Sequence, residues 1–116
     1  MPTNPVTADF YIKQHDLLPP IVAVLKDATG LITDLTGATV LFKLRPATDP
    51  SAAGISSPVG IDPDPTTGKV TYSWSAGNTD TPGEYYGEFE VTFGTGKKES
   101  FPNDSYLQIS IIADIS

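Results

Sequence analysis

Glycine and proline recur along this chain at short intervals, and their spacing limits the elements that it can form. The 116 residues include 10 glycines and 11 prolines, spread through the sequence instead of being collected in one tail. Glycine weakens the interior of helices and strands, and proline lacks the N–H that a helix interior or a central strand needs. The segments left between them are short, which favours a fold of many short strands over one of long helices.

Between these turns, apolar residues mostly alternate with polar ones, as in strands that bury one face. The alternation extends over residues 40–45, 70–75, 84–93 and 107–115. Trp74 shares the apolar side of its segment with Val70 and Tyr72, so we expect it in the core. Shorter strands are predicted at residues 9–13, 21–25 and 98–101, the last as the returning arm of a hairpin.

The longest predicted strand, residues 84–93, separates apolar from acidic side chains. Glu84, Glu88 and Glu90 mark the side that meets solvent. Gly87 lies on the apolar side, where the missing side chain predicts either a bulge or a bulky neighbour that covers it. Tyr86 lies on the glutamate side, and we expect it either to be covered by another strand or to be exposed for binding.

Residues 6–18 contain neither glycine nor proline and therefore have a helix as an alternative. Phe10, Gln14 and Leu17 or Leu18 would line one side of that helix. The aromatic and β-branched residues at 10–12 prefer a strand, and the prolines at 19 and 20 push Leu18 out of helical geometry. We therefore predict an edge strand here.

Residues 47–67 are rich in proline and glycine and predict an irregular loop. A short edge strand is expected within residues 55–61, because an edge tolerates the N–H that proline lacks. Ile55, Val59 and Ile61 in this loop are candidate contacts with a partner. The loop and residues 1–8 are the segments that we expect to become ordered against neighbouring proteins.

About seven short strands with no visible crossover helix predict an antiparallel β-sandwich. Pro82 and Gly83 precede Tyr85 just where the longest strand begins. This pattern resembles the tyrosine corner of immunoglobulin-like sandwiches, in which the tyrosine hydroxyl bonds to upstream backbone. The predicted fold class is all-β, an immunoglobulin-like antiparallel β-sandwich of about seven strands. It would occupy residues 9–116 as one domain, preceded by a flexible N-terminal arm at residues 1–8.

Composition argues against several classes of function. With 14 acidic and 7 basic residues the net charge is -7, whereas nucleic-acid binding requires basic patches. The chain has no cysteine, which excludes disulfides and thiolate metal sites. The apolar run at residues 21–25 is far too short for a membrane helix. The N-terminus has neither the basic residues nor the apolar stretch of a secretory signal.

The candidates for catalysis or metal binding all have simpler structural interpretations. His15 is the only histidine, and the adjacent Asp16 would point to the opposite face of a strand, so it is poorly placed to orient the ring. Asp62 and Asp64 could contribute to a calcium site, but they lack the spacing of a calcium loop and are interpreted as turn formers.

Three further patterns are equally weak. The glycines and lysine at residues 94–97 lack the helix that a phosphate-binding loop requires. Glu84, Glu88 and Glu90 could act as acid and base in a glycosidase, but such residues more often keep a strand soluble. Asn103 fits the N-glycosylation pattern, which means little without a secretory signal. We therefore predict no enzymatic activity, no metal, no cofactor and no small-molecule substrate.

Several short motifs stand in a characteristic order along most of the chain. They are residues 10–20, 25–30, 34–40 and 42–46 in the first half, and residues 68–72, 80–85, 88–91 and 101–104 in the second. In this order they resemble the N-terminal domain of bacteriophage upper baseplate proteins and related small immunoglobulin-like phage structural proteins.

The resemblance implies a β-sandwich that docks other tail or baseplate components in a virion and has no catalytic residues. Its partners would be other virion proteins in a symmetric assembly, after synthesis in the bacterial host cytoplasm. Domains of this family often precede a longer coiled or receptor-attachment region, whereas this sequence ends at Ser116, directly after its last predicted strand. If Ser116 is the end of the protein, it would be a free-standing module, for which a neck, tail or capsid-decorating position is also open.

The sequence thus leaves two main hypotheses. The first is a virion structural protein that acts through protein–protein contacts. The alternative is a carbohydrate-binding module that attaches the particle to host-surface glycans through aromatic residues such as Tyr86, because flat aromatic rings offer contact area with little loss of entropy. A hydrolase built on the strand glutamates is a remote third.

Overall fold

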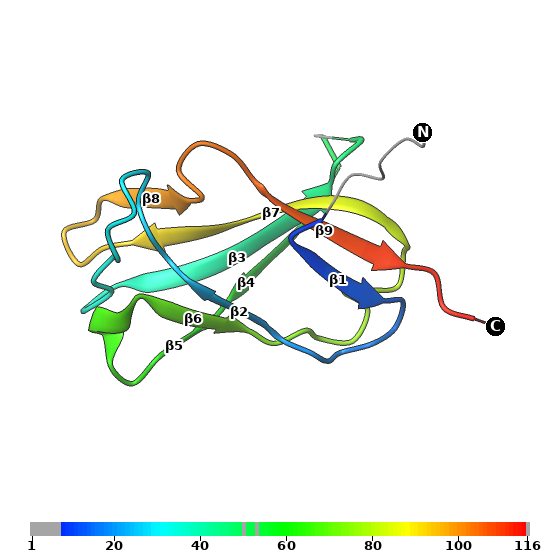
Figure 1. The fold of residues 1–116 in the computed structure, drawn as a ribbon, viewed down its shortest axis with the longest axis horizontal. Coiled ribbons are helices and arrows are strands. Elements are labelled where there is room, and N and C mark those ends of the chain that lie inside the picture. The colour runs from blue at the N-terminus through cyan, green and yellow to red at the C-terminus, as the bar shows by residue number, and fades with distance from the viewer. Residues whose placement is uncertain (1–7, 50, 53, 116) are drawn as a thin grey trace.

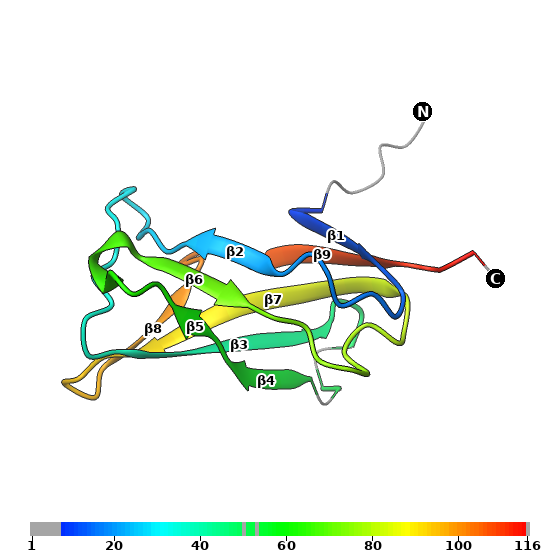
Figure 2. The ribbon, with the colours of Figure 1, turned by 90° about the horizontal axis from the view of Figure 1, so that it is seen from below.

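Two β-sheets pack face to face in the computed structural model, which describes residues 8–49, 51–52 and 54–115 (Figure 1). The larger, six-stranded sheet has the order β1-β9-β7-β3-β4, and β8 pairs with β7 beside this path. The smaller sheet has the order β2-β6-β5. Figure 2 shows the smaller sheet lying over β7 and β3. The all-β prediction is confirmed, with a sandwich-like pair of sheets.

The strands of the larger sheet are β1 (Phe10–Lys13), β3 (Thr39–Pro46), β4 (Ile55–Pro58), β7 (Gly83–Thr92), β8 (Lys98–Phe101) and β9 (Leu107–Ile112). Those of the smaller sheet are β2 (Ile21–Val24), β5 (Gly60–Ile61) and β6 (Lys69–Tyr72). The only helix among the described residues is a 3-10 turn, η1 (Pro65–Thr67), so no helix there is long and apolar enough to cross a membrane.

The first strand corrects the expectation of a purely antiparallel fold. β1 pairs with β9 in parallel, with Phe10 opposite Ile109, whereas the other strand pairs of the described residues are antiparallel. No crossover helix is needed, because β1 and β9 come from opposite ends of the chain and the rest of the domain connects them. The helical alternative for residues 6–18 is wrong in its described part, which forms an edge strand as predicted. Residues 1–7 of the predicted arm lie outside the described residues.

The predicted edge strand within residues 55–61 divides between the two sheets. β4 forms an edge of the larger sheet and β5 an edge of the smaller one. Val59 lies between them, and its N–H donates to the carbonyl of Val40 at 3.1 Å. Pro58, opposite Leu41, is tolerated on this edge strand because its missing N–H is not needed there.

Aromatic rings fill the space between the sheets. Phe42 is fully buried, and its ring centroid lies 4.5 Å from that of Tyr72, 5.2 Å from Phe89 and 6.3 Å from Trp74. Trp74 is 5% exposed, which confirms its predicted place in the core. These residues come from both sheets and the segment after β6, so the alternation seen in the sequence does produce one shared apolar core.

Gly87 provides the room that this core needs. The pairing of β7 with β3 and β9 runs through Gly87 without a bulge. A Cβ at this position would lie 2.9 Å from Cδ1 of Ile109 and 3.1 Å from two ring atoms of Phe42. Of the two predictions for Gly87, a bulky neighbour is therefore confirmed.

The tyrosine corner is present at the start of β7. The Tyr85 hydroxyl donates to the carbonyl of Thr81 at 2.6 Å. Burial raises the pKa of Tyr85 above its ordinary value. Gly83 has a φ of +148°, a backbone conformation that side chains disfavour, so a glycine after Pro82 suits the turn.

Removing that hydroxyl tests the corner. Tyr85→Phe is expected to lower the free energy of unfolding by about 0.5–1.5 kcal/mol, the usual net contribution of one internal hydrogen bond. Urea unfolding followed by Trp74 fluorescence measures the change. Tyr106→Phe is the matched control, because its hydroxyl makes no hydrogen bond within the described residues, and its effect should stay below about 0.5 kcal/mol. Equal effects of the two substitutions would contradict a stabilising corner.

Candidate functional site: a tyrosine-lined pocket on the outer sheet

The face of the six-stranded sheet that points away from the core, here called the outer face, gathers charged and aromatic side chains. Because Phe89 and Val91 are buried, their neighbours on β7 point outward. The register places Tyr86 opposite Arg45, and Glu88 opposite Lys43. Residues distant in the sequence thereby become neighbours on one surface.

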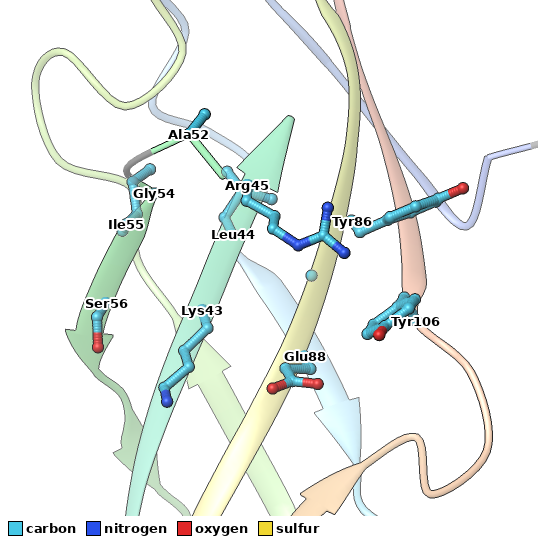
Figure 3. A pocket seen from close by; sticks show the side chains of 11 residues that line it. Lys43, Leu44, Arg45, Ala52, Gly54, Ile55, Ser56, Tyr86, Glu88 and Tyr106 are labelled. Atoms are coloured by element: carbon cyan, nitrogen blue, oxygen red, sulfur yellow. The ribbon is translucent and has the colours of Figure 1, made fainter. Parts of the chain in front are cut away.

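A pocket of about 450 Å³ opens on this outer face (Figure 3). Its floor is formed by β3 and β7, including Lys43, Arg45 and Glu88. Ile55 on β4 forms one wall, and Tyr106, which lies just before β9, stands on the other side. The volume falls within the range of about 300–1,000 Å³ that is usual for small-ligand pockets.

Two tyrosines and an arginine form a cluster in this pocket. The rings of Tyr86 and Tyr106 stack with centroids 5.2 Å apart and an interplanar angle of 18°. The guanidinium carbon of Arg45 lies 5.5 Å from each centroid, a distance at which a cation is attracted by the ring faces. Arg45 also donates from Nη1 to the carbonyl of Pro46 at 3.3 Å. These contacts hold the guanidinium beside the two rings.

Tyr86 is half-buried and Tyr106 is 47% exposed. Among the described residues, Tyr106 from the loop before β9 partly covers the ring of Tyr86, and no strand lies over that ring. The sequence predicted that Tyr86 is either covered by another strand or exposed for binding. The ring of Tyr86 is instead partly covered, and part of it stays exposed. Whether it contacts a partner stays a prediction.

The three glutamates of β7 have different surroundings. Glu90 pairs with Lys43 at 3.0 Å and with Lys98 at 3.9 Å. Glu84 accepts a hydrogen bond from the Ser110 hydroxyl at 2.7 Å. Glu88 lines the pocket, and the ion pairs within the described residues include neither Glu88 nor Arg45. The pocket therefore contains a carboxylate and a guanidinium that do not neutralise each other directly.

The hydrogen bond from Lys43, together with the charges of Lys43 and Lys98, lowers the pKa of Glu90. A carboxylate whose pKa is lower in the folded state stabilises the fold above its unfolded pKa, and this contribution disappears as the pH falls through the folded value. Glu90→Gln is therefore expected to lower stability by up to about 1 kcal/mol at neutral pH, and this loss should shrink as the pH falls below the ordinary glutamate pKa and through the lower pKa of the folded state. Urea unfolding from neutral to acidic pH measures it. If Glu90→Gln lowers stability by the same amount in a Lys43→Met background, the ion pair between Lys43 and Glu90 is not the cause of the loss.

The other charged candidates lie elsewhere and serve turns. His15 is exposed, with Nε2 3.8 Å from Oδ1 of Asp80 rather than beside Asp16. Asp62 Oδ1 accepts from the N–H of Asp64 at 2.9 Å, and Asp64 Oδ1 from that of Thr66 at 3.1 Å, which confirms their interpretation as turn formers. Within residues 8–49, 51–52 and 54–115, no group of three or more His, Cys, Asp or Glu is placed to hold a metal.

The remaining patterns also have structural roles. Residues 94–97 form the turn of the β7–β8 hairpin, closed by a bond from the Phe93 N–H to the Lys97 carbonyl at 2.8 Å. Asn103 Oδ1 accepts from the N–H of Ala28 at 2.9 Å, which links two loops.

The candidate partner contacts of the 47–67 loop are half-buried. Ile55, Val59 and Ile61 pack against the core, and Ile55 alone of the three lines the pocket. Their contact with a partner stays a prediction. Sequence reasoning missed Arg45. Its place two residues after Lys43 puts it on the polar side of the alternation, but only the register reveals its neighbour Tyr86.

No protein-family model matches this chain, and no curated protein has a significantly similar sequence.

Proposed function

We propose that this chain is a structural protein of a bacteriophage virion, made in the host cytoplasm, which docks neighbouring virion proteins through its outer face. The proposal rests on the order of motifs set out above and on the chemistry of the pocket. A baseplate, tail, neck or capsid position is compatible with it.

The strand order supports an immunoglobulin-like assignment. In such a sandwich, strands B, E and D face strands G, F and C, and a strand C′ extends the second sheet. Here β2, β6 and β5 take the first set of places, and β9, β7, β3 and β4 take the second. The bond from Tyr85 to Thr81 at the start of β7 stands where the tyrosine corner of strand F is expected.

The observation that carries the docking proposal is the cluster of Arg45, Tyr86 and Tyr106 in an open pocket. Tyrosine and arginine are enriched among the residues that dominate binding energy at protein interfaces. The net charge of -7 favours partners with basic faces. In a symmetric particle, repeated weak contacts reinforce one another because each linked contact raises the effective concentration for the next.

Purified particles test the proposal. Mass spectrometry should find this chain in a fixed copy number, and electron microscopy with cross-linking should place its outer face against another virion protein. An Arg45→Ala, Tyr86→Ala double variant is expected to reduce its incorporation, whereas Val22→Ala, at an exposed side chain on β2 of the smaller sheet, should not. Particles that lack stoichiometric amounts of the wild-type chain would contradict a structural role.

Carbohydrate binding is the second candidate, because one specific observation favours it. The exposed ring of Tyr106, the half-buried ring of Tyr86 and a carboxylate that forms no ion pair within the described residues lie together in a pocket of small-ligand size. A glycan array with the isolated chain tests this function. The absence of any hit, together with a Tyr86→Ala variant that still supports assembly and infection, would dispose of it.

A further inference from the structure

We infer that the pocket on the outer face selects an uncharged sugar residue, held between the tyrosine rings and the carboxylate of Glu88. This inference rests on the second proposed function, carbohydrate binding, and adds the charge class of the glycan and the residues that would recognise it.

Charge balance is the first step. The charged side chains that line the pocket are Lys43, Arg45 and Glu88. Lys43 is neutralised by Glu90 at 3.0 Å, and Glu90 also pairs at 3.9 Å with Lys98, which does not line the pocket. What remains is one guanidinium and one carboxylate, so the pocket as a whole favours neither an anion nor a cation.

Each kind of charged ligand meets a specific obstacle. An acidic sugar that pairs with Arg45 has to lie in the same pocket as the carboxylate of Glu88, on a chain with a net charge of -7. An amino sugar attracted to Glu88 brings its ammonium group into the same pocket as the guanidinium of Arg45, which repels it. A neutral ligand avoids both forms of repulsion.

Hydrogen-bonding capacity is the second step. An ionised carboxylate only accepts hydrogen bonds and a guanidinium only donates them. A hydroxyl group does both, so a molecule with several hydroxyls can donate to Glu88 and accept from Arg45. Hydrogen bonds to charged groups are stronger than those between neutral partners. Glu88 and Arg45 can therefore bind a ligand firmly even though it carries no charge.

The apolar contacts are the third step. Tyr106 is 47% exposed and stacks on Tyr86, so the pair offers a flat aromatic surface beside the polar groups. Ala52, Gly54 and Ser56 lie on the opposite wall, where the side chain of Ile55 turns toward the core. A pyranose ring has hydroxyls at its rim and C–H groups on its faces, which matches polar groups on the floor and aromatic carbon at the side.

Titration of the isolated full chain, followed by NMR chemical shifts, tests this inference. The probes are neutral oligosaccharides that end in glucose, galactose or N-acetylglucosamine. Counterparts ending in glucuronate or sialic acid, and oligomers of glucosamine, form the charged sets. At least one neutral probe is expected to shift the amides of residues 43–45 and 86–88, and the charged sets should bind at least about tenfold more weakly.

Variants assign the residues. Glu88→Gln is expected to weaken binding of the neutral probe about tenfold, as for the loss of a bond to a charged acceptor. Tyr106→Ala should weaken it about fivefold. Glu84→Gln, on the same face of β7 but outside the pocket, and Tyr11→Ala are the matched controls and should bind as wild type. Urea unfolding of each variant shows whether the fold is retained.

The outcomes separate the inference from the proposed functions. Preference for an acidic or amino sugar would overturn the charge argument while leaving carbohydrate binding in place. Neutral-probe binding that is unchanged in both Glu88→Gln and Tyr106→Ala would overturn this site. No binding of any probe would overturn the inference and the second candidate function together, whereas incorporation into particles would still support the docking role.

Discussion

Replacing Phe42 with alanine is expected to lower the free energy of unfolding by about 3–5 kcal/mol. Phe42 is 0% exposed and lies in the middle of β3, with the rings of Tyr72, Phe89 and Trp74 around it. Alanine removes the whole ring, so its apolar contacts are lost. A cavity remains, because the surrounding rings are held by two different sheets and cannot all move in to fill it. Since small domains are stable by only about 5–15 kcal/mol, this single change removes a large share of the total.

Urea unfolding, with Trp74 fluorescence and circular dichroism as separate probes, measures the loss. Leu31→Ala is the control, because Leu31 is 69% exposed and its truncation should change stability by less than about 0.5 kcal/mol. If the alanine variant does not fold, Phe42→Leu provides the measurement, because it keeps most of the volume and should be destabilising by a smaller amount. A loss below about 1 kcal/mol for Phe42→Ala would contradict a central role for this ring.

The parts of the fold that were predictable depend on local patterns. Period-two alternation identified β3, β7 and β9, because the side chains of a strand point to opposite faces wherever the strand lies in a sheet. The tyrosine corner was also predictable, since its hydrogen bond spans only the four positions from Thr81 to Tyr85. In both cases the cause of the structure lies within a few residues.

The parts that were not predictable depend on how distant segments align. Nothing in the sequence around Phe10 specifies a parallel partner, because β1 meets β9 only once the sheets have assembled. The pocket shows the same limit. Arg45 and Tyr86 become neighbours through one register of β3 against β7, and a shift by one residue would send either side chain to the core. The sequence could suggest single residues as contacts, but it could not predict that Arg45 and Tyr86 lie side by side.

Gly87→Ala is expected to be destabilising by about 1–3 kcal/mol, the usual effect of adding volume to a well-packed core. The added methyl group would lie 2.9 Å from Cδ1 of Ile109 and 3.1 Å from the ring of Phe42. The end of the Ile109 side chain can rotate away, but the Phe42 ring is enclosed by Tyr72, Phe89 and Trp74. In an exposed strand alanine would be slightly stabilising relative to glycine, because it restricts the unfolded chain, so the sign of the effect reports on the close contact.

Two further variants make the Gly87 result specific. Gly94→Ala is the matched control, since a Cβ there would meet only the carbonyl of Gly37 at 3.7 Å, and it should change stability by less than about 0.5 kcal/mol. Ile109→Val removes the Cδ1 atom that the new methyl group would strike. The double variant Gly87→Ala, Ile109→Val should therefore lose less stability than the two single changes added together, with a coupling of about 0.5 kcal/mol or more. Strict additivity would mean that Ile109 is not the obstacle, and the strain of Gly87→Ala would then have to arise at Phe42, where a Phe42→Leu background would relieve it.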